Sequence, residues 1–171
     1  MGKAEVNVID YAMKAEKDGI TFYTRAARKF NDKEMKEVFM ELAKEEAKHL
    51  ETFIGIKAKA EKKGVGQIFR SENISDYLAT ILREGLFPRG DSMVKRLEKV
   101  STVYEACIIA MSAEKNAVML YSELAKLSKD KDQKKIFESI AKEERSHMVM
   151  VGNIRADHDP AYGGWKFGRF L

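Results

Sequence analysis

Two near-identical heptapeptides carry the residues with the clearest potential for chemistry. AKEEAKH ends at His49, and AKEERSH ends at His147. In each of them a glutamate, Glu46 or Glu144, stands three residues before the histidine. Residues three apart lie on one face of a helix, so each pair can present a carboxylate and an imidazole together. That combination suits a metal ion, although a single Glu-x-x-His in a charged helix is usually a surface feature.

The heptapeptides belong to a longer internal repeat. At an offset of 98 residues, which aligns His49 with His147, the two halves of the sequence match without a gap. Other aligned pairs are Glu16 with Glu114, Tyr23 with Tyr121, and Phe39 with Phe137. A repeat of this length predicts a structural unit that occurs twice.

Each half is predicted to form a hairpin of two long helices. The first half should contain helices at about 6–30 and 33–62, separated by a break at Asn31 and Asp32. In the second half, Asp91 or Ser92 is expected to cap a helix that reaches about Leu127. A last helix should follow a break at 129–132 and end near Ile154. Breaks this short imply antiparallel neighbours.

Residues 1–156 are therefore expected to form one all-α domain, a four-helix bundle of two repeated hairpins. The segment at about 64–90 is long enough to return along the bundle as a crossover, and a short helix is expected within it at 75–86. Residues 157–171, rich in glycine and aromatic residues, are expected to be a non-helical tail. The tail could pack on the bundle or on a neighbouring subunit, or it could contact a ligand.

The helical spacing of apolar residues places polar side chains in the predicted core. Each helix has an apolar stripe that one glutamate interrupts near its middle, and the second and fourth stripes add a histidine one turn later. The six residues are Glu16, Glu46, His49, Glu114, Glu144 and His147. Glu45 and Glu143 fall off the stripes and are expected to be solvated.

Four carboxylates buried together must be neutralised. They could be protonated, paired with buried cations or bound to metal, and no lysine or arginine lies on these stripes near the glutamates. Two divalent cations would balance four carboxylates. A carboxylate-rich set with one imidazole per metal suits iron or manganese, with zinc as a possible substitute. The sequence thus predicts a dinuclear site of the kind found in di-iron carboxylate bundles.

Two tyrosines and one cysteine share the stripes. Tyr23 and Tyr121 each lie seven residues after one of the glutamates, two turns along the same face. They could be ordinary core residues, but we favour hydrogen bonds to carboxylates across the bundle, which would orient the ligands. Cys107, the one cysteine in the chain, is expected to be a small core residue rather than a redox thiol. His158 lies outside the repeat and is assigned no role.

Composition limits the partners and the location. Lysine and arginine exceed aspartate and glutamate, giving a net charge of +4, but the basic residues are dispersed beside glutamates in helical segments. We expect solvated helix faces and no nucleic-acid partner. The amino-terminal segment is charged and no apolar run has the length of a spanning helix, so we expect no signal peptide and no membrane partner. The single cysteine fits a reducing compartment, and we expect a cytoplasmic location.

At these residues the sequence resembles the rubrerythrin branch of the ferritin-like superfamily. The resemblance covers about 5–155 and rests on the six glutamates and histidines, with Phe22-Tyr23 and Leu120-Tyr121 beside them. It implies a di-iron centre held by all six residues, which would act in catalysis through the metals. The implied reaction is the reduction of hydrogen peroxide or dioxygen. The superfamily also includes oxidases and iron-storage cages, so ferroxidase or iron-storage activity is the alternative.

The sequence departs from the rubrerythrin pattern in two ways. Rubrerythrins usually carry a rubredoxin domain with four cysteines, which this sequence lacks, so electrons are expected from a separate rubredoxin-like donor. They also have an additional glutamate three residues after the third-helix ligand, where this chain has Ala117, and its counterpart in the first half is Gly19.

We expect a homodimer. A structural bundle with an incidental zinc site is a third interpretation.

Overall fold

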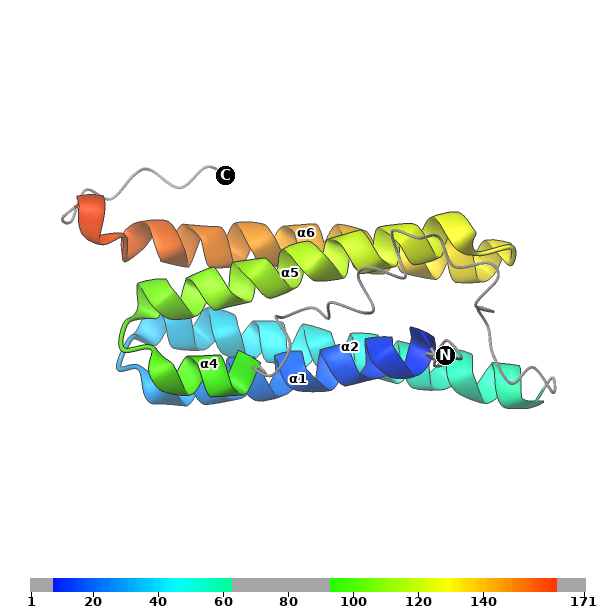
Figure 1. Ribbon diagram of the computed structural model, residues 1–171, viewed down its shortest axis with the longest axis horizontal. Coiled ribbons are helices and arrows are strands. Elements are labelled where there is room, and N and C mark those ends of the chain that lie inside the picture. The colour runs from blue at the N-terminus through cyan, green and yellow to red at the C-terminus, as the bar shows by residue number, and fades with distance from the viewer. Residues whose placement is uncertain (1–7, 63–92, 163–171) are drawn as a thin grey trace, which may run out of the picture.

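The computed structural model describes residues 8–62 and 93–162, and the regular secondary structure in these ranges is all helical. The long helices are α1 (Val8–Lys29), α2 (Lys33–Lys62), α5 (Val103–Leu127) and α6 (Lys131–Asp157). Two short elements accompany them, α4 (Met93–Lys99) and the 3₁₀ turn η2 (Pro160–Tyr162). The helices α1 and α2 form one antiparallel hairpin, α5 and α6 form the other, and the hairpins stack as two layers (Figure 1). The predicted four-helix bundle of two hairpins is confirmed.

The direction of the helices requires a long connection between the hairpins. The helix α2 ends at one end of the bundle, whereas α5 begins at the other, so α2 and α5 run in the same direction (Figure 1). Two helices that run in the same direction cannot be joined by a short turn. The crossover expected at 64–90, with its short helix at 75–86, lies outside the described residues.

The breaks between helices follow from capping side chains. The carboxylate of Asp32 accepts a hydrogen bond from the backbone N–H of Met35 at 2.7 Å, at the start of α2. Asp130 accepts from the N–H groups of Asp132 and Gln133 at 2.8 and 3.0 Å, at the start of α6. Asp32 and Asp130 are equivalent in the repeat, so the same cap begins the second helix of both hairpins.

The prediction of one continuous third helix from residue 91 or 92 to Leu127 is wrong. The helix α4 ends at Lys99, and α5 begins at Val103. Thr102 and Glu105 form a capping box in which each side chain accepts a hydrogen bond from the backbone N–H of the other, at 3.2 and 3.1 Å. Lys29 of α1 donates a hydrogen bond to the carbonyl of Leu97 at 2.6 Å and so anchors the end of α4.

The beginning of the tail also differs from its expected non-helical structure. The helix α6 continues through Asp157, and the single turn η2 follows. The imidazole of His158 hydrogen-bonds the carbonyl of Ile154 at 2.8 Å and the carboxylate of Asp32 at 3.0 Å. His158 therefore ties the end of α6 to the turn between α1 and α2. Residues 163–171 lie outside the described part of the chain.

The buried residues form two apolar clusters along the bundle. One cluster contains Phe22, Tyr23 and Phe39, and the other contains Phe53, Tyr121 and Phe137. The polar residues of the four stripes belong to neither cluster, although they are just as deeply buried. Apolar packing on this scale stabilises the bundle and fixes the helices that carry those polar residues.

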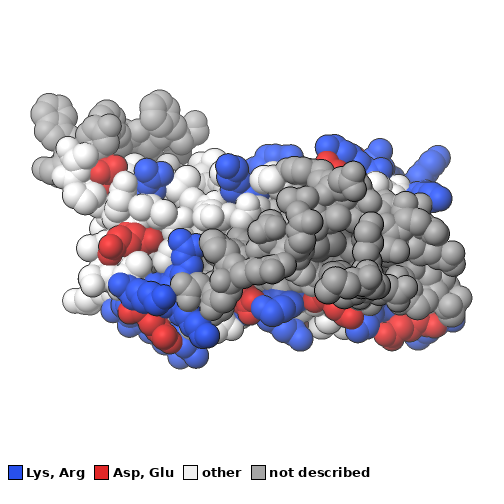
Figure 2. All heavy atoms as spheres, viewed as in Figure 1, with Lys and Arg blue, Asp and Glu red and all other residues white. Residues whose placement is uncertain are grey.

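The outer faces of the helices are charged. Acidic and basic side chains lie close together on the face shown in Figure 2. Exposed pairs at helical spacing include Lys14 with Asp18 and Lys44 with Glu41. Among the described residues, no helix has an apolar stretch long enough to cross a membrane.

Candidate metal centre

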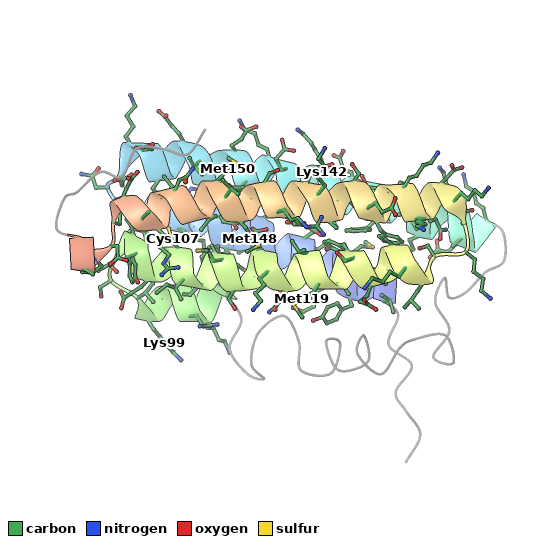
Figure 3. All side chains as sticks on the ribbon, turned by 90° about the horizontal axis from the view of Figure 1, so that it is seen from above. Lys99, Cys107, Met119, Lys142, Met148 and Met150 are labelled. Atoms are coloured by element: carbon green, nitrogen blue, oxygen red, sulfur yellow. The ribbon has the colours of Figure 1, made fainter. Side chains whose placement is uncertain are left out.

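The six residues predicted to bind metal come together in the interior of the bundle. The helices α1 and α5 each contribute one glutamate, and α2 and α6 each contribute a glutamate and a histidine. Each of these residues is 5% exposed or less: Glu16, Glu46, His49, Glu114, Glu144 and His147. In Figure 3, which looks onto α5 and α6, the labelled Lys142 and Met148 bracket the part of α6 that carries Glu144 and His147.

The donor atoms form two overlapping groups. Glu16, Glu46, His49 and Glu144 offer four ligand atoms that all lie within 4.8 Å of one another. Glu46, Glu114, Glu144 and His147 do the same. Two carboxylates, those of Glu46 and Glu144, belong to both groups.

The shared carboxylates turn one oxygen toward each imidazole. Glu144 places Oε1 3.2 Å from Nδ1 of His49 and Oε2 3.1 Å from Nδ1 of His147. Glu46 places Oε2 3.5 Å from Nδ1 of His49 and Oε1 3.4 Å from Nδ1 of His147. The imidazole rings are stacked with their centroids 5.7 Å apart. Glu46 and Glu144 could therefore each contribute a ligand oxygen to both donor groups.

Each tyrosine of the stripes hydrogen-bonds a glutamate of the opposite hairpin. The hydroxyl of Tyr23 on α1 donates to Glu114 on α5, and the hydroxyl of Tyr121 on α5 donates to Glu16 on α1. Tyr23 also packs edge-on against Phe39, and Tyr121 packs against Phe53. Glu16 and Glu114 each belong to one donor group only. Because the tyrosine rings are held in the apolar clusters, their hydroxyls fix the orientation of these two carboxylates.

Burial and crowding of the carboxylates favour bound protons when no metal is present. Burial raises the pKa of Glu16, and Glu46 raises it further. Burial also raises the pKa of Glu114, as do the charges of Glu46 and Glu144. Burial would raise the pKa of Glu46 as well, but hydrogen bonds with Glu16, His147 and His49 outweigh it and lower that pKa.

The two imidazoles also bind protons when no metal is present, because negatively charged carboxylates surround them. Burial alone would lower the pKa of both histidines, but the surrounding carboxylates outweigh it. They raise the pKa of His49, and they raise the pKa of His147 to about 12. Protons and metal ions therefore compete for the same atoms of the site.

The hydrogen-bonding state of the site fits a metal pair. Among the described residues, three buried side-chain polar atoms have no hydrogen-bond partner: Nδ1 of His49, Oε2 of Glu114 and Oε1 of Glu144. All three belong to the donor groups. Buried polar atoms without partners are rare in folded proteins. A divalent cation would bind such atoms through their lone pairs and neutralise the carboxylates.

One residue of the site was not predicted from the sequence. Glu143 was expected to be solvated, and its side chain is 44% exposed, but its Oε2 lies 3.0 Å from Nε2 of His49. Burial would raise the pKa of Glu143, but the hydrogen bonds from His49 and Ser139 lower it, so this carboxylate is ionised. Its equivalent in the repeat, Glu45, pairs with Lys48 at 2.5 Å.

Two further positions bear on the interior. Cys107, labelled in Figure 3, is buried in the apolar cluster around Phe39, and burial raises the pKa of its thiol to about 12. The thiol is therefore protonated near neutral pH, as a core residue would be. Gly19 packs directly on Glu46, because a Cβ atom at this position would lie 3.4 Å from Cγ of that glutamate.

Comparisons with known proteins agree with this arrangement. The family model described as rubrerythrin matches residues 7–154. A crystal structure of a Thermotoga maritima protein, described as ferritin-like and diiron-carboxylate, is similar with a TM-score of 0.64 and 26% sequence identity. The match covers 91% of this chain and 99% of that chain. A search of curated protein sequences finds no match. On the family model, which spans most of the sequence, the chain belongs to the rubrerythrin family.

Proposed function

We propose that the protein is a di-iron oxidoreductase that reduces hydrogen peroxide. The observation that carries the proposal is the pair of overlapping donor groups with Glu46 and Glu144 in common. Glu16 and His49 would complete the ligands of one metal, and Glu114 and His147 would complete those of the other. When bound, a pair of iron(II) ions would supply Lewis acidity and two electrons, one from each ion.

The protein's own residues would do three things in this reaction. The four glutamates balance the charge of two divalent cations, which keeps both metals in one buried site. The hydroxyls of Tyr23 and Tyr121 hold Glu114 and Glu16 in place. The apolar clusters on the same stripes limit the access of water to the site.

The stoichiometry of the reaction favours peroxide as the oxidant. Hydrogen peroxide takes up two electrons and two protons to give two molecules of water, so a two-metal site can complete the reaction in one step. Dioxygen needs four electrons to reach water, and this site would need external electrons before that reaction was complete. Ala117 stands where rubrerythrins have a further carboxylate, and the structure leaves a methyl group there in place of a ligand.

The proposal assigns the supply of electrons to a separate protein. The chain has one cysteine, and Cys107 is buried, so it cannot provide a four-thiolate iron site. A small redox protein of the rubredoxin type would reduce the metals between turnovers. We further propose that the protein acts as a homodimer in the cytoplasm.

The proposal is tested by comparing the two oxidants. The protein is loaded anaerobically with iron(II) and mixed in a stopped-flow instrument with hydrogen peroxide or dioxygen at equal concentrations. We expect peroxide to oxidise both irons in one kinetic phase, faster than dioxygen does. A faster reaction with dioxygen would overturn the peroxidase proposal in favour of an oxidase or an iron-storage protein.

The iron-storage alternative differs from the peroxide reductase in the number of subunits that it requires. Storage requires a hollow cage of many subunits, whereas a peroxide reductase does not. Light scattering of the purified protein should give the mass of a dimer. A cage-sized particle that takes up many iron ions per chain would instead support ferroxidase and storage activity.

A further inference from the structure

The two nitrogen atoms of His49 face different carboxylates. Nδ1 faces the donor groups, 3.2 Å from Glu144, and has no hydrogen-bond partner. Nε2 lies 3.0 Å from Oε2 of Glu143, outside the donor groups. A carboxylate oxygen accepts hydrogen bonds, so the N–H at Nε2 donates this one. In the neutral imidazole that binds metal, the proton is then on Nε2 and the lone pair of Nδ1 is directed into the site.

Glu143 is itself held in position. Its other oxygen, Oε1, accepts a hydrogen bond from the hydroxyl of Ser139 at 2.9 Å, one turn earlier on α6. The contacts from Ser139 and His49 engage both oxygens of one carboxylate. The side chain of Glu143 is therefore fixed although it is partly exposed to solvent.

The first half of the repeat has no matching arrangement. The equivalents of Ser139 and Glu143 are Glu41 and Glu45, and these two side chains pair along α2 with lysines. Glu41 accepts from Lys44 at 2.9 Å, and Glu45 accepts from Lys48 at 2.5 Å. Within the described part of the chain, the hydrogen bond and the carboxylate contacts of His147 all involve Nδ1.

One difference in the repeat explains why the two glutamates behave differently. Lys48 is replaced by Ser146 in the second half. Lys48 stands one turn after Glu45 and holds its carboxylate along the surface of α2. The hydroxyl of Ser146 bonds the carbonyl of Lys142 instead. Without a lysine at this position, Glu143 can reach across to the histidine of the other hairpin.

We infer that Glu143 is a positioning residue for His49 and that Glu45 does not do the same for His147, so the two metal positions differ in affinity. The inference rests on the proposed metal centre. A carboxylate that fixes the tautomer and orientation of a histidine ligand typically contributes about 10- to 100-fold to metal affinity. The position that includes His49 should therefore bind metal first.

The test uses cobalt(II), whose visible absorption reports each metal bound. Anaerobic titration of the wild-type chain should give two steps of unequal affinity. Glu143→Ala should weaken the tighter step by about 10- to 100-fold and leave the weaker step unchanged. Glu45→Ala is the matched control, and both of its steps should be those of the wild type.

A second readout separates positioning from general damage to the fold. In the cobalt-loaded protein, paramagnetically shifted proton NMR signals report the imidazole N–H groups in water. The N–H of His49 should exchange slowly with solvent in the wild type and in Glu45→Ala, and quickly in Glu143→Ala. The signal of His147 should be the same in all three proteins.

The outcomes distinguish this inference from the proposed function. Two cobalt steps in the wild type, with Glu143→Ala unchanged or with equal losses in both alanine variants, would overturn the role of Glu143 and leave the metal centre intact. A wild-type chain that binds no cobalt would overturn the metal centre itself and the inference with it.

Discussion

The hairpin α1–α2 and the hairpin α5–α6 place the same donor groups at the site but surround them differently. Each hairpin supplies two glutamates, one histidine and one tyrosine at equivalent positions of the repeat. The tyrosines cross to the opposite hairpin in the same way, from Tyr23 to Glu114 and from Tyr121 to Glu16. Just outside these residues the halves diverge, because Glu143 contacts a histidine and Glu45 contacts a lysine.

The comparison shows which positions the proposed metal centre would constrain. Such a centre would use the four carboxylates and two imidazoles, and both copies of the repeat supply their share of them. Residues on the outer faces can change without loss of the donor set. The difference between Lys48 and Ser146 is one such change, and it alters a contact to the site.

The largest effect is expected from removing a shared carboxylate. Glu46→Ala and Glu144→Ala should each weaken both metal positions by more than about 100-fold, beyond the loss typical of an outer hydrogen-bond partner. The two variants should behave alike, because both glutamates belong to both donor groups. Metal content measured after equilibrium dialysis checks this. Glu45→Ala is the control, and an equal loss of metal in that variant would mean that the wrong helix face has been assigned.

The next effect concerns pH and applies to both halves. The raised pKa values of Glu16 and Glu114 mean that the folded, metal-free protein keeps protons that the unfolded chain releases above about 4.5. The two imidazoles likewise keep protons in the folded, metal-free protein that the unfolded chain releases above about pH 6.5. These groups stabilise the metal-free fold fully below those values, and the stabilisation is lost as pH rises through the folded-state pKa values.

Metal binding has the opposite dependence on pH, because it requires the same groups to be deprotonated. The metal-loaded protein should melt at a higher temperature than the metal-free protein. The difference between the two Tm values should widen from about pH 6 to about pH 9. Calorimetric melts of both forms across this range test the expectation, and a gap that narrows with rising pH would contradict it.

A smaller effect is expected from the tyrosines. Tyr23→Phe and Tyr121→Phe each remove one hydrogen bond to a buried carboxyl group, which should lower the unfolding free energy of the metal-free protein by about 1–3 kcal/mol. Because the two bonds are equivalent in the repeat, the losses should be similar and should add in the double variant to within about 0.5 kcal/mol. Urea denaturation measures all three values. Strong non-additivity would show that the two hydroxyls act through a common network.

The smallest effect is expected at Gly19 and Ala117, which are equivalent in the repeat. Gly19→Ala adds a Cβ at an ordinary contact distance of 3.4 Å from Glu46, so the gain in helix propensity should stabilise the protein by up to about 1 kcal/mol. Ala117→Gly should cost about as much. Urea denaturation checks both changes. A destabilised Gly19→Ala variant with weakened metal binding would show that Glu46 needs the space beside Gly19.

The sequence was sufficient to predict the bundle and the six donor residues, because both depend on periodicity. A helix repeats every 3.6 residues, so an interrupted apolar stripe locates a buried polar side chain without coordinates. The offset of 98 residues then aligned Glu16 with Glu114 and His49 with His147. The breaks at 31–32 and 129–132 were also predicted, and in the structure Asp32 and Asp130 cap the helices that follow them.

The features that the sequence did not predict depend on individual side-chain hydrogen bonds, which the apolar periodicity does not reveal. The break before α5 was predicted to be helical because apolar residues continue through it, yet Thr102 and Glu105 cap a new helix there. The contact between Glu143 and His49 depends on side-chain rotamers on two hairpins, which periodicity does not specify. The sequence does show that Ser146 replaces the lysine found at position 48 of the first half. This difference predicts a contact between Glu143 and His49 only once α2 is known to lie beside α6.

The central claim is that two equivalent halves build one dinuclear metal centre. The most direct test is an anaerobic titration of the metal-free protein with iron(II), followed by the measurement of bound iron per chain. The account predicts saturation at two iron ions per chain. Saturation at one ion, or no binding, would contradict it.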